Sequence, residues 1–163
     1  MGKKNKEALK TKNKIFTVNP AANATDVALL IARIAITGLM LTHGLPKLTM
    51  LFSGEPVQFV GLLGLSPELC LGLAVFAEVV CSLFVLVGFG TRVAVIPLII
   101  TMLIAAFYIH AADPFVKKEP ALQYLLVYVM LLFAGSGRYS VDYFLHRQVL
   151  SPAYTGVKEK SLV

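Results

Sequence analysis

The chain has 163 residues, 57% of them hydrophobic, and a mean hydropathy of +0.76. A soluble domain this apolar would be unusual, so the composition favours an integral membrane protein over a soluble enzyme. The length leaves room for one domain and no second.

The first 25 residues differ from the rest because they are rich in lysine and have no apolar periodicity. Their charged residues are Lys3, Lys4, Lys6, Lys10, Lys12, Lys14 and Glu7. We expect residues 1–25 to form a disordered tail. A basic run can indicate nucleic-acid binding, but a basic flank before the first membrane span is the commoner explanation. We therefore expect no nucleic-acid partner and a tail that contacts anionic membrane lipid.

Four apolar blocks follow the tail, at about Asp26–Leu45, Pro67–Val87, Val93–Ala111 and Glu119–Ala134. About 20 helical residues cross the hydrocarbon core of a bilayer. The blocks lack the alternation of barrel strands, and only helices and closed barrels satisfy the backbone in lipid. The predicted fold is therefore all-α, an integral membrane four-helix up-down-up-down bundle over residues 26–147. Residues 148–163 are expected to form a C-terminal tail.

The distribution of positive charge predicts the orientation of these helices. If the N-terminus is cytoplasmic, eleven Lys and Arg lie on the inner side and three on the outer side. The inner residues are the six tail lysines, Arg92, Arg138, Arg147, Lys158 and Lys160, and the outer residues are Lys47, Lys117 and Lys118. By the positive-inside rule, both termini are expected in the cytoplasm.

Two charges of opposite sign lie inside the apolar blocks. Glu78 is the only charge in the run Leu69–Val87, and Arg33 lies in the first block. An ionised side chain at the bilayer centre costs roughly 2.5–3.5 kcal/mol, so such residues normally face a partner inside a bundle. Counted from Asp26 and from Val87, the two residues have similar depth, and we expect an Arg33–Glu78 contact. The pair can fix helix packing or serve in proton or ligand binding, and the sequence leaves both open.

A second group of polar residues is expected at the outer edge of the hydrocarbon. Its members are His43, Lys47, His110, Glu119 and Gln123. The two histidines each lie about 25 Å above the inner boundary, counted along their helices. A lone polar residue at this depth usually only extends its polar end toward water. Five such residues at one level on three helices predict a binding or catalytic site.

Patterns for other cofactors are missing from the sequence. There is no CxxC, CxxCH, HExxH or GxGxxG pattern, so we expect no metal, haem or nucleotide site. Cys70 and Cys81 are eleven residues apart on one predicted helix. That separation is roughly 16 Å, which is too far for a disulfide.

The order and spacing of these residues resemble the DoxX family of small four-span membrane proteins. The matching features are Arg33, His43-Gly44-x-x-Lys47-Leu48, Ala77-Glu78, Gly90-Thr-Arg92, His110, Glu119 with Ala121-Leu122-x-x-Leu125, and Gly137-Arg-x-Ser-x-Asp142. The likeness covers about Leu29 to Asp142. The lysine-rich tail and the residues after Asp142 lie outside it.

The resemblance implies a bacterial or archaeal cytoplasmic membrane and a quinone, because members of the family are similar to the membrane subunit of archaeal thiosulfate:quinone oxidoreductase. It implies a quinone-linked oxidoreductase, or the quinone-interacting membrane subunit of one. The candidate catalytic residues are Glu78, His110 and Glu119, and the candidate quinone-binding residues are Arg33, His43, Lys47 and Gln123. Two alternatives stay open: a non-catalytic membrane anchor for a redox partner protein, and a small transporter or lipid-handling protein.

Overall fold

The computed structural model describes residues 22–62 and 64–147 of the chain. Residues 1–21 and 148–163, which hold most of the predicted N-terminal tail and the whole predicted C-terminal tail, lie outside this part. The described part is all-helical and contains no strand. The prediction of an all-α fold is confirmed for these residues.

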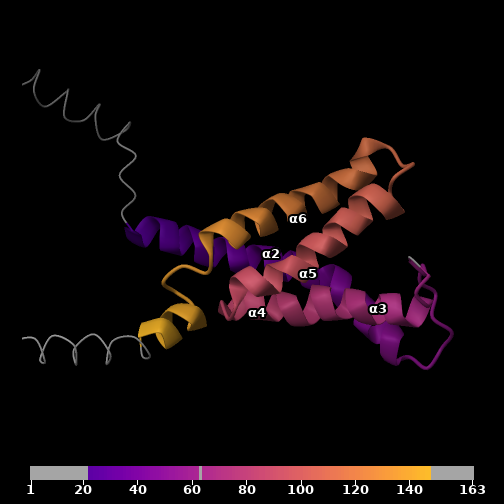
Figure 1. Ribbon diagram of the computed structural model, residues 1–163, viewed down its shortest axis with the longest axis horizontal. Coiled ribbons are helices and arrows are strands. Elements are labelled where there is room, and N and C mark those ends of the chain that lie inside the picture. Colours follow the sequence, from indigo (N-terminus) through magenta and orange to yellow (C-terminus); the bar gives the residue numbers. More distant parts are fainter. Residues whose placement is uncertain (1–21, 63, 148–163) are drawn as a thin grey trace, which may run out of the picture.

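The described helices follow one another along the chain (Figure 1). They are α2 (Ala22–Phe52), α3 (Pro67–Val75), the π-helix η1 (Phe76–Cys81), α4 (Ser82–Val87), α5 (Thr91–Ile104), the π-helix η2 (Ala105–Ile109) and α6 (Phe115–Ala134). A short helix covers residues 141–147. Segments α3, η1 and α4 join without a break, as do α5 and η2, so each of these sets forms one continuous rod.

Three helical stretches in the described part are long and apolar enough to cross a membrane: Ala24–Phe52, Pro67–Val87 and Thr91–Ile109. Their surfaces agree with this, because large apolar side chains such as Phe76 and Phe107 are exposed. Exposed apolar area on this scale marks a surface that contacts lipid or a partner rather than water. The chain is therefore a membrane protein with several spanning helices.

The first helix is longer than the sequence predicted. The expected block began at Asp26 and ended at Leu45, whereas α2 runs from Ala22 to Phe52 and includes Pro46. A proline removes one backbone donor but does not always end a helix in a membrane protein. The residues after it stay helical because their apolar side chains pack on α3 and η1 in a cluster around Leu71.

The rod formed by α3, η1 and α4, which we call the second rod because it follows α2, has the bounds that the sequence predicted, Pro67 to Val87. Its start is fixed locally, because the Ser66 hydroxyl accepts a hydrogen bond from the Leu69 N–H and Pro67 occupies the first turn. Its end is fixed by Gly88, which adopts a left-handed conformation with φ of 72°. A side chain at Gly88 would also collide with the Arg33 guanidinium.

The helices pack around a core that runs the length of the molecule. Helix α2 lies against α3, η1, α4 and α6, and α5 lies against η1, α4 and α6. The start of α2 and residues 141–147 lie at the same end of the molecule (Figure 1). We call this end, which also carries the 88–90 turn, the basal end. The end with residues 49–66 and 110–118 is the apical end.

Asp142 fastens the basal end together. Its carboxylate accepts hydrogen bonds from the N–H groups of Gly90 at 2.7 Å and Thr91 at 3.3 Å, and from the Ser136 hydroxyl at 3.2 Å. Its own N–H donates to the Gly88 carbonyl at 2.9 Å. The first N–H groups of a helix have no partner within the helix. Asp142 therefore caps α5 from a distant part of the chain.

A second contact ties the segment after α6 to the start of α2. The Arg138 guanidinium lies 3.4 Å from the Asp26 carboxylate, and the Arg138 N–H donates to the same carboxylate at 2.9 Å. The basal ends of α2, α4, α5 and α6 are thus joined through residues 135–142.

We expect Asp142→Ala to lower the free energy of unfolding by about 1–2 kcal/mol, because the start of α5 loses its cap. Thermal unfolding of the purified protein in detergent measures this loss. Asp113→Ala is the matched control, because Asp113 is an exposed carboxylate in the apical turn that bonds only to His110. Equal losses in the two variants would contradict the capping role.

Candidate functional site

Glu78 is the most deeply buried carboxylate among the described residues, with 1% of its surface exposed. It lies in the π-helix η1, between the buried residues Ala77 and Val79. A π-helical turn inside an α-helix is rare and often marks a functional position. A carboxylate at this depth requires a partner from another helix.

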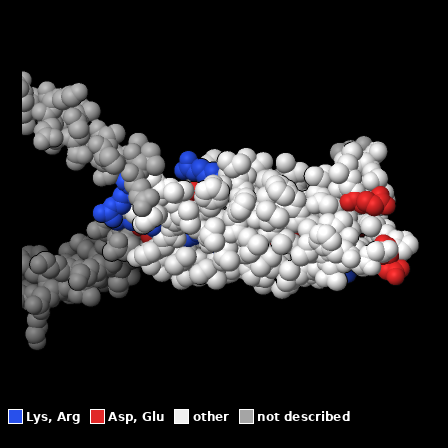
Figure 2. Space-filling view, turned by 90° about the horizontal axis from the view of Figure 1, so that it is seen from below, with Lys and Arg blue, Asp and Glu red and all other residues white. Residues whose placement is uncertain are grey.

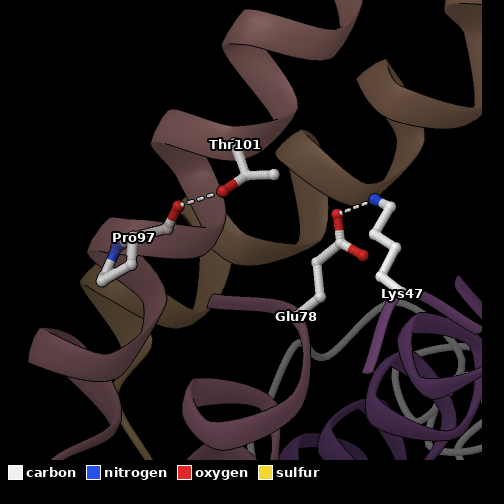
Figure 3. A network of polar contacts seen from close by, with 4 residues as sticks. All are labelled: Lys47, Glu78, Pro97 and Thr101. Atoms are coloured by element: carbon white, nitrogen blue, oxygen red, sulfur yellow. Dashed lines mark hydrogen bonds and ion pairs between the residues drawn. The ribbon is translucent and has the colours of Figure 1, made fainter. Parts of the chain in front are cut away.

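That partner is Lys47 of α2. Its ammonium donates to Glu78 Oε1 at 2.5 Å, and the lysine side chain is 29% exposed against 2% for the glutamate (Figure 3). The Phe59 ring, from the segment between α2 and α3, lies with its centroid 6.0 Å from Lys47 Nζ. This distance is at the limit of a cation–π contact. The ion pair is thus buried at the carboxylate and partly open to solvent or lipid at the ammonium.

Gly44 lets α2 come close enough for this ion pair to form. A Cβ atom at Gly44 would lie 2.9 Å from a methyl carbon of Val79 and 3.1 Å from Cβ of Glu78. The backbone of α2 therefore touches η1 directly at Glu78. Lys47, three residues later, then reaches across to the carboxylate.

Three polar atoms beside the ion pair are buried and have no hydrogen-bonding partner among the described residues. They are Glu78 Oε2, Ser82 Oγ and Tyr128 Oη. Ser82 follows Glu78 on the same rod, and the hydroxyls of Ser82 and Tyr128 lie within range of each other without a hydrogen bond of normal geometry. We call Lys47, Glu78, Ser82 and Tyr128 the Glu78 cluster.

Two threonine hydroxyls in the membrane-spanning helices, those of Thr37 and Thr101, have hydrogen-bonding partners. The Thr37 hydroxyl donates to the Ser82 carbonyl at 3.1 Å, and the Thr101 hydroxyl donates to the Pro97 carbonyl at 2.9 Å (Figure 3). Buried polar groups in native proteins are nearly always hydrogen-bonded. The unpartnered atoms of the Glu78 cluster therefore call for an explanation, and a bound polar group is one.

A row of aromatic rings joins the cluster to the surface. Tyr128 stacks on Tyr124 with ring centroids 6.3 Å apart, and the edge of Tyr124 meets His43 at 5.9 Å. Both tyrosines lie on α6, four residues apart, whereas His43 is an exposed residue of α2. Among the predicted site residues, His43 thus contacts the rings next to the cluster.

The remaining predicted site residues at the apical end form local pairs. His110 Nδ1 lies 2.7 Å from the Asp113 carboxylate, and the Gln123 amide donates to Glu119 one turn earlier at 3.1 Å. No hydrogen bond in the described structure joins these residues to Glu78. The expected layer of five therefore divides: Lys47 and His43 face the buried cluster, and the other three pair near the apical turn.

The predicted Arg33–Glu78 contact is wrong. Arg33 is fully buried, but its guanidinium donates to the carbonyls of Val85 at 3.4 Å, Leu86 at 3.2 Å and Tyr139. The acceptors in α4 are its last carbonyls, which have no partner within the helix. Arg33 therefore fastens the basal end, at a distance from the Lys47–Glu78 pair.

The prediction failed because it used Asp26 as the level at which the second rod ends. Asp26 instead meets Arg138, beyond the turn that follows α4. Arg33 is the residue of α2 that lies level with the last turn of α4. The register differs by about seven residues, or about 10 Å, and this shift places Glu78 opposite Gly44 and Lys47.

Four residues at this site escaped the sequence analysis: Ser82, Tyr124, Tyr128 and Phe59. Tyr124 and Tyr128 are spaced by four on an apolar helix, which places them on one face. That spacing was the available signal. Phe59 lies in a connecting segment and no pattern pointed to it. Among the described residues, no group of three or more His, Cys, Asp or Glu is placed to hold a metal ion.

Comparison with known families finds a match to the model described as DoxX over residues 28–111, about half of the chain. The chain therefore belongs to the DoxX family, as its motifs indicated. Comparisons with curated proteins and with solved structures found no match.

We expect Lys47→Met to destabilise the protein strongly, because it leaves the buried Glu78 carboxylate without its partner. Breaking a buried pair from one side costs about 3–5 kcal/mol. Glu78→Met should cost less, because the partly exposed Lys47 ammonium can turn outward. The double variant should recover most of the loss of Lys47→Met, as measured by thermal unfolding in detergent.

Lys117→Met is the matched control, because Lys117 is an exposed lysine and should tolerate the change. Purely additive losses in the Lys47/Glu78 cycle would show that the two charges do not depend on each other.

Proposed function

We propose that this DoxX-family chain binds a quinone at the Glu78 cluster and is the quinone-binding membrane part of a redox system. The observation that carries the proposal is the set of three buried, unpartnered polar atoms on Glu78, Ser82 and Tyr128. They lie beside a buried ion pair, inside helices whose outer surfaces are apolar.

The donor set fits a small aromatic ring with two oxygen atoms. Ser82 and Tyr128 each carry a hydroxyl that can donate to an oxygen of the ring or accept from it. The Lys47 ammonium places a positive charge at the same site, and Glu78 supplies a carboxylate that can accept a proton. A bound quinone would supply two-electron redox chemistry that the side chains of this protein lack.

A ligand with an apolar tail can reach the cluster from the lipid. Helices α2 and α6 contact each other, and the His43 and Tyr124 rings meet between them. Because His43 is exposed, this seam connects the surface of the bundle with Tyr128. We assign His43 and Tyr124 to the approach, and His110, Glu119 and Gln123 stay the predicted contacts of an alternative site at the apical end.

We further propose that α6 is a fourth membrane span, which completes an up-down-up-down bundle over residues 26–147. The helix has 20 residues, or about 30 Å, and its outer face exposes Leu126, Met130 and Phe133. Both ends of the described chain lie at the basal end (Figure 1). An even number of spans accounts for that arrangement.

The charge distribution supports a cytoplasmic basal end. Figure 2 shows most of the visible Lys and Arg at the basal end and most of the visible Asp and Glu at the apical end. The positive-inside rule then puts both termini in the cytoplasm of a prokaryotic cell.

The proposed orientation predicts that Glu55→Cys is labelled by an impermeant maleimide in intact cells. Arg92→Cys should be labelled only after the membrane is opened. Both are tested in a chain whose buried Cys70 and Cys81 are replaced by alanine. The reverse labelling pattern would overturn the orientation.

The proposed site predicts that Tyr128→Phe and Ser82→Ala each weaken binding of a short-tailed benzoquinone to the folded protein. One lost hydrogen bond of about 0.5–1.5 kcal/mol corresponds to a loss of roughly twofold to tenfold in affinity. Equilibrium dialysis in detergent measures the affinity. Tyr108→Phe is the matched control, because Tyr108 is exposed on η2 and should leave binding unchanged.

His110→Ala in the same assay separates the two candidate locations. Unchanged affinity favours the Glu78 cluster. A loss with His110→Ala and none with Tyr128→Phe would move the site to the apical residues. Solute or proton flux in liposomes, without any quinone binding, would instead favour a transporter.

A further inference from the structure

The unpartnered atoms of the Glu78 cluster differ in what they can bind. Glu78 Oε2 belongs to a carboxylate held in an ion pair with Lys47, and an ionised carboxylate only accepts hydrogen bonds. The hydroxyls of Ser82 and Tyr128 can each donate or accept. Any occupant of the cluster must therefore bring a donor for Oε2, whereas the two hydroxyls adapt to either kind of partner.

No described protein group supplies that donor. Lys47 donates to the other carboxylate oxygen, Oε1, and its ammonium lies toward Phe59. The Tyr128 and Ser82 hydroxyls make no hydrogen bond to the carboxylate. Oε2 is thus a buried acceptor that receives no hydrogen bond from any described residue.

The two redox forms of a quinone present opposite groups to such an acceptor. The oxidised form has two carbonyl oxygens, which are acceptors only, and one of them beside Oε2 would leave two buried acceptors facing each other. The reduced form has two hydroxyls. One hydroxyl can donate to Oε2 while the two lone pairs of its oxygen accept from Ser82 and from Tyr128, which satisfies all three protein atoms.

We infer that the Glu78 cluster selects the reduced, dihydroxy form of its aromatic ligand over the oxidised, carbonyl form. The inference rests on the proposed function and adds which form of the ligand the site holds. Since leaving a buried acceptor unsatisfied is costly, the preference should be at least tenfold in affinity. A tenfold preference raises the reduction potential of the bound two-electron couple by about 30 mV.

Three matched probes test the inference on the full-length chain in detergent under anaerobic conditions. They are a benzoquinone with a ten-carbon tail, the corresponding hydroquinone, and the dimethyl ether of that hydroquinone. The ether keeps the ring and both oxygens but has no O–H donor. We expect the hydroquinone to bind at least tenfold more tightly than either of the other two in equilibrium dialysis.

Glu78→Gln tests whether the carboxylate sets the preference. The amide has nearly the same shape, and it can turn its NH₂ group toward the ligand while its oxygen accepts from Lys47. The preference should then shift toward the benzoquinone by tenfold or more. Tyr108→Phe should leave the preference of the parent chain unchanged. If Glu78→Gln does not fold, the comparison of the hydroquinone with its ether in the parent chain still decides.

The outcomes separate the inference from the function on which it rests. Equal affinity for the three probes, or tighter binding of the benzoquinone, would overturn the selection of the reduced form and leave quinone binding in place. A hydroquinone no tighter than its ether would do the same. If none of the probes binds, the proposed function fails together with the inference.

Discussion

The arrangement of this protein depends on a carboxylate placed where water cannot solvate it. Glu78 is buried among apolar helices, so its charge must be compensated from within the protein. Lys47 does this, and Gly44 brings the two helices close enough for the lysine to reach. The ion pair thereby fixes which face of α2 meets η1, and the apolar packing around Leu71 keeps α2 helical past Pro46. A helix that ended at Leu45 would have left Glu78 without a partner.

The second buried charge is compensated in a different way. Arg33 uses backbone carbonyls, and Asp142 caps α5 in the same region, so the basal end satisfies its charged groups with helix ends and segment 135–142. Both contacts pair a charged side chain with backbone groups. The Glu78 cluster has the opposite character, because a side-chain pair there leaves one carboxylate oxygen and two hydroxyls unused.

Sequence reasoning succeeded where structure is decided locally and failed where it depends on register. The rod from Pro67 to Val87 was predicted because its apolar residues form one continuous run, and the serine and the glycine that fix its ends in the structure directly adjoin that run. The partner of Glu78 was predicted wrongly. The prediction counted depth along each helix, and that count is valid only if neighbouring helices end at one level. The start of α2 extends past the end of α4, and so the level of each residue shifts relative to its neighbour.

Unpartnered atoms alone do not identify a site, since the Nε atom of Arg33 and the hydroxyl of Thr91 are also buried without a partner. Those two atoms lie at the basal end. There another nitrogen of Arg33 donates to the Leu86 carbonyl, and the Thr91 N–H donates to Asp142. At the Glu78 cluster the unpartnered atoms come from two separate parts of the chain, the rod Pro67–Val87 and α6, and they lie beside a charge and a π-helical turn. Proteins commonly break local rules at functional sites, where the cost is offset by ligand binding. The coincidence of these features at one place is what separates a binding site from an isolated packing defect.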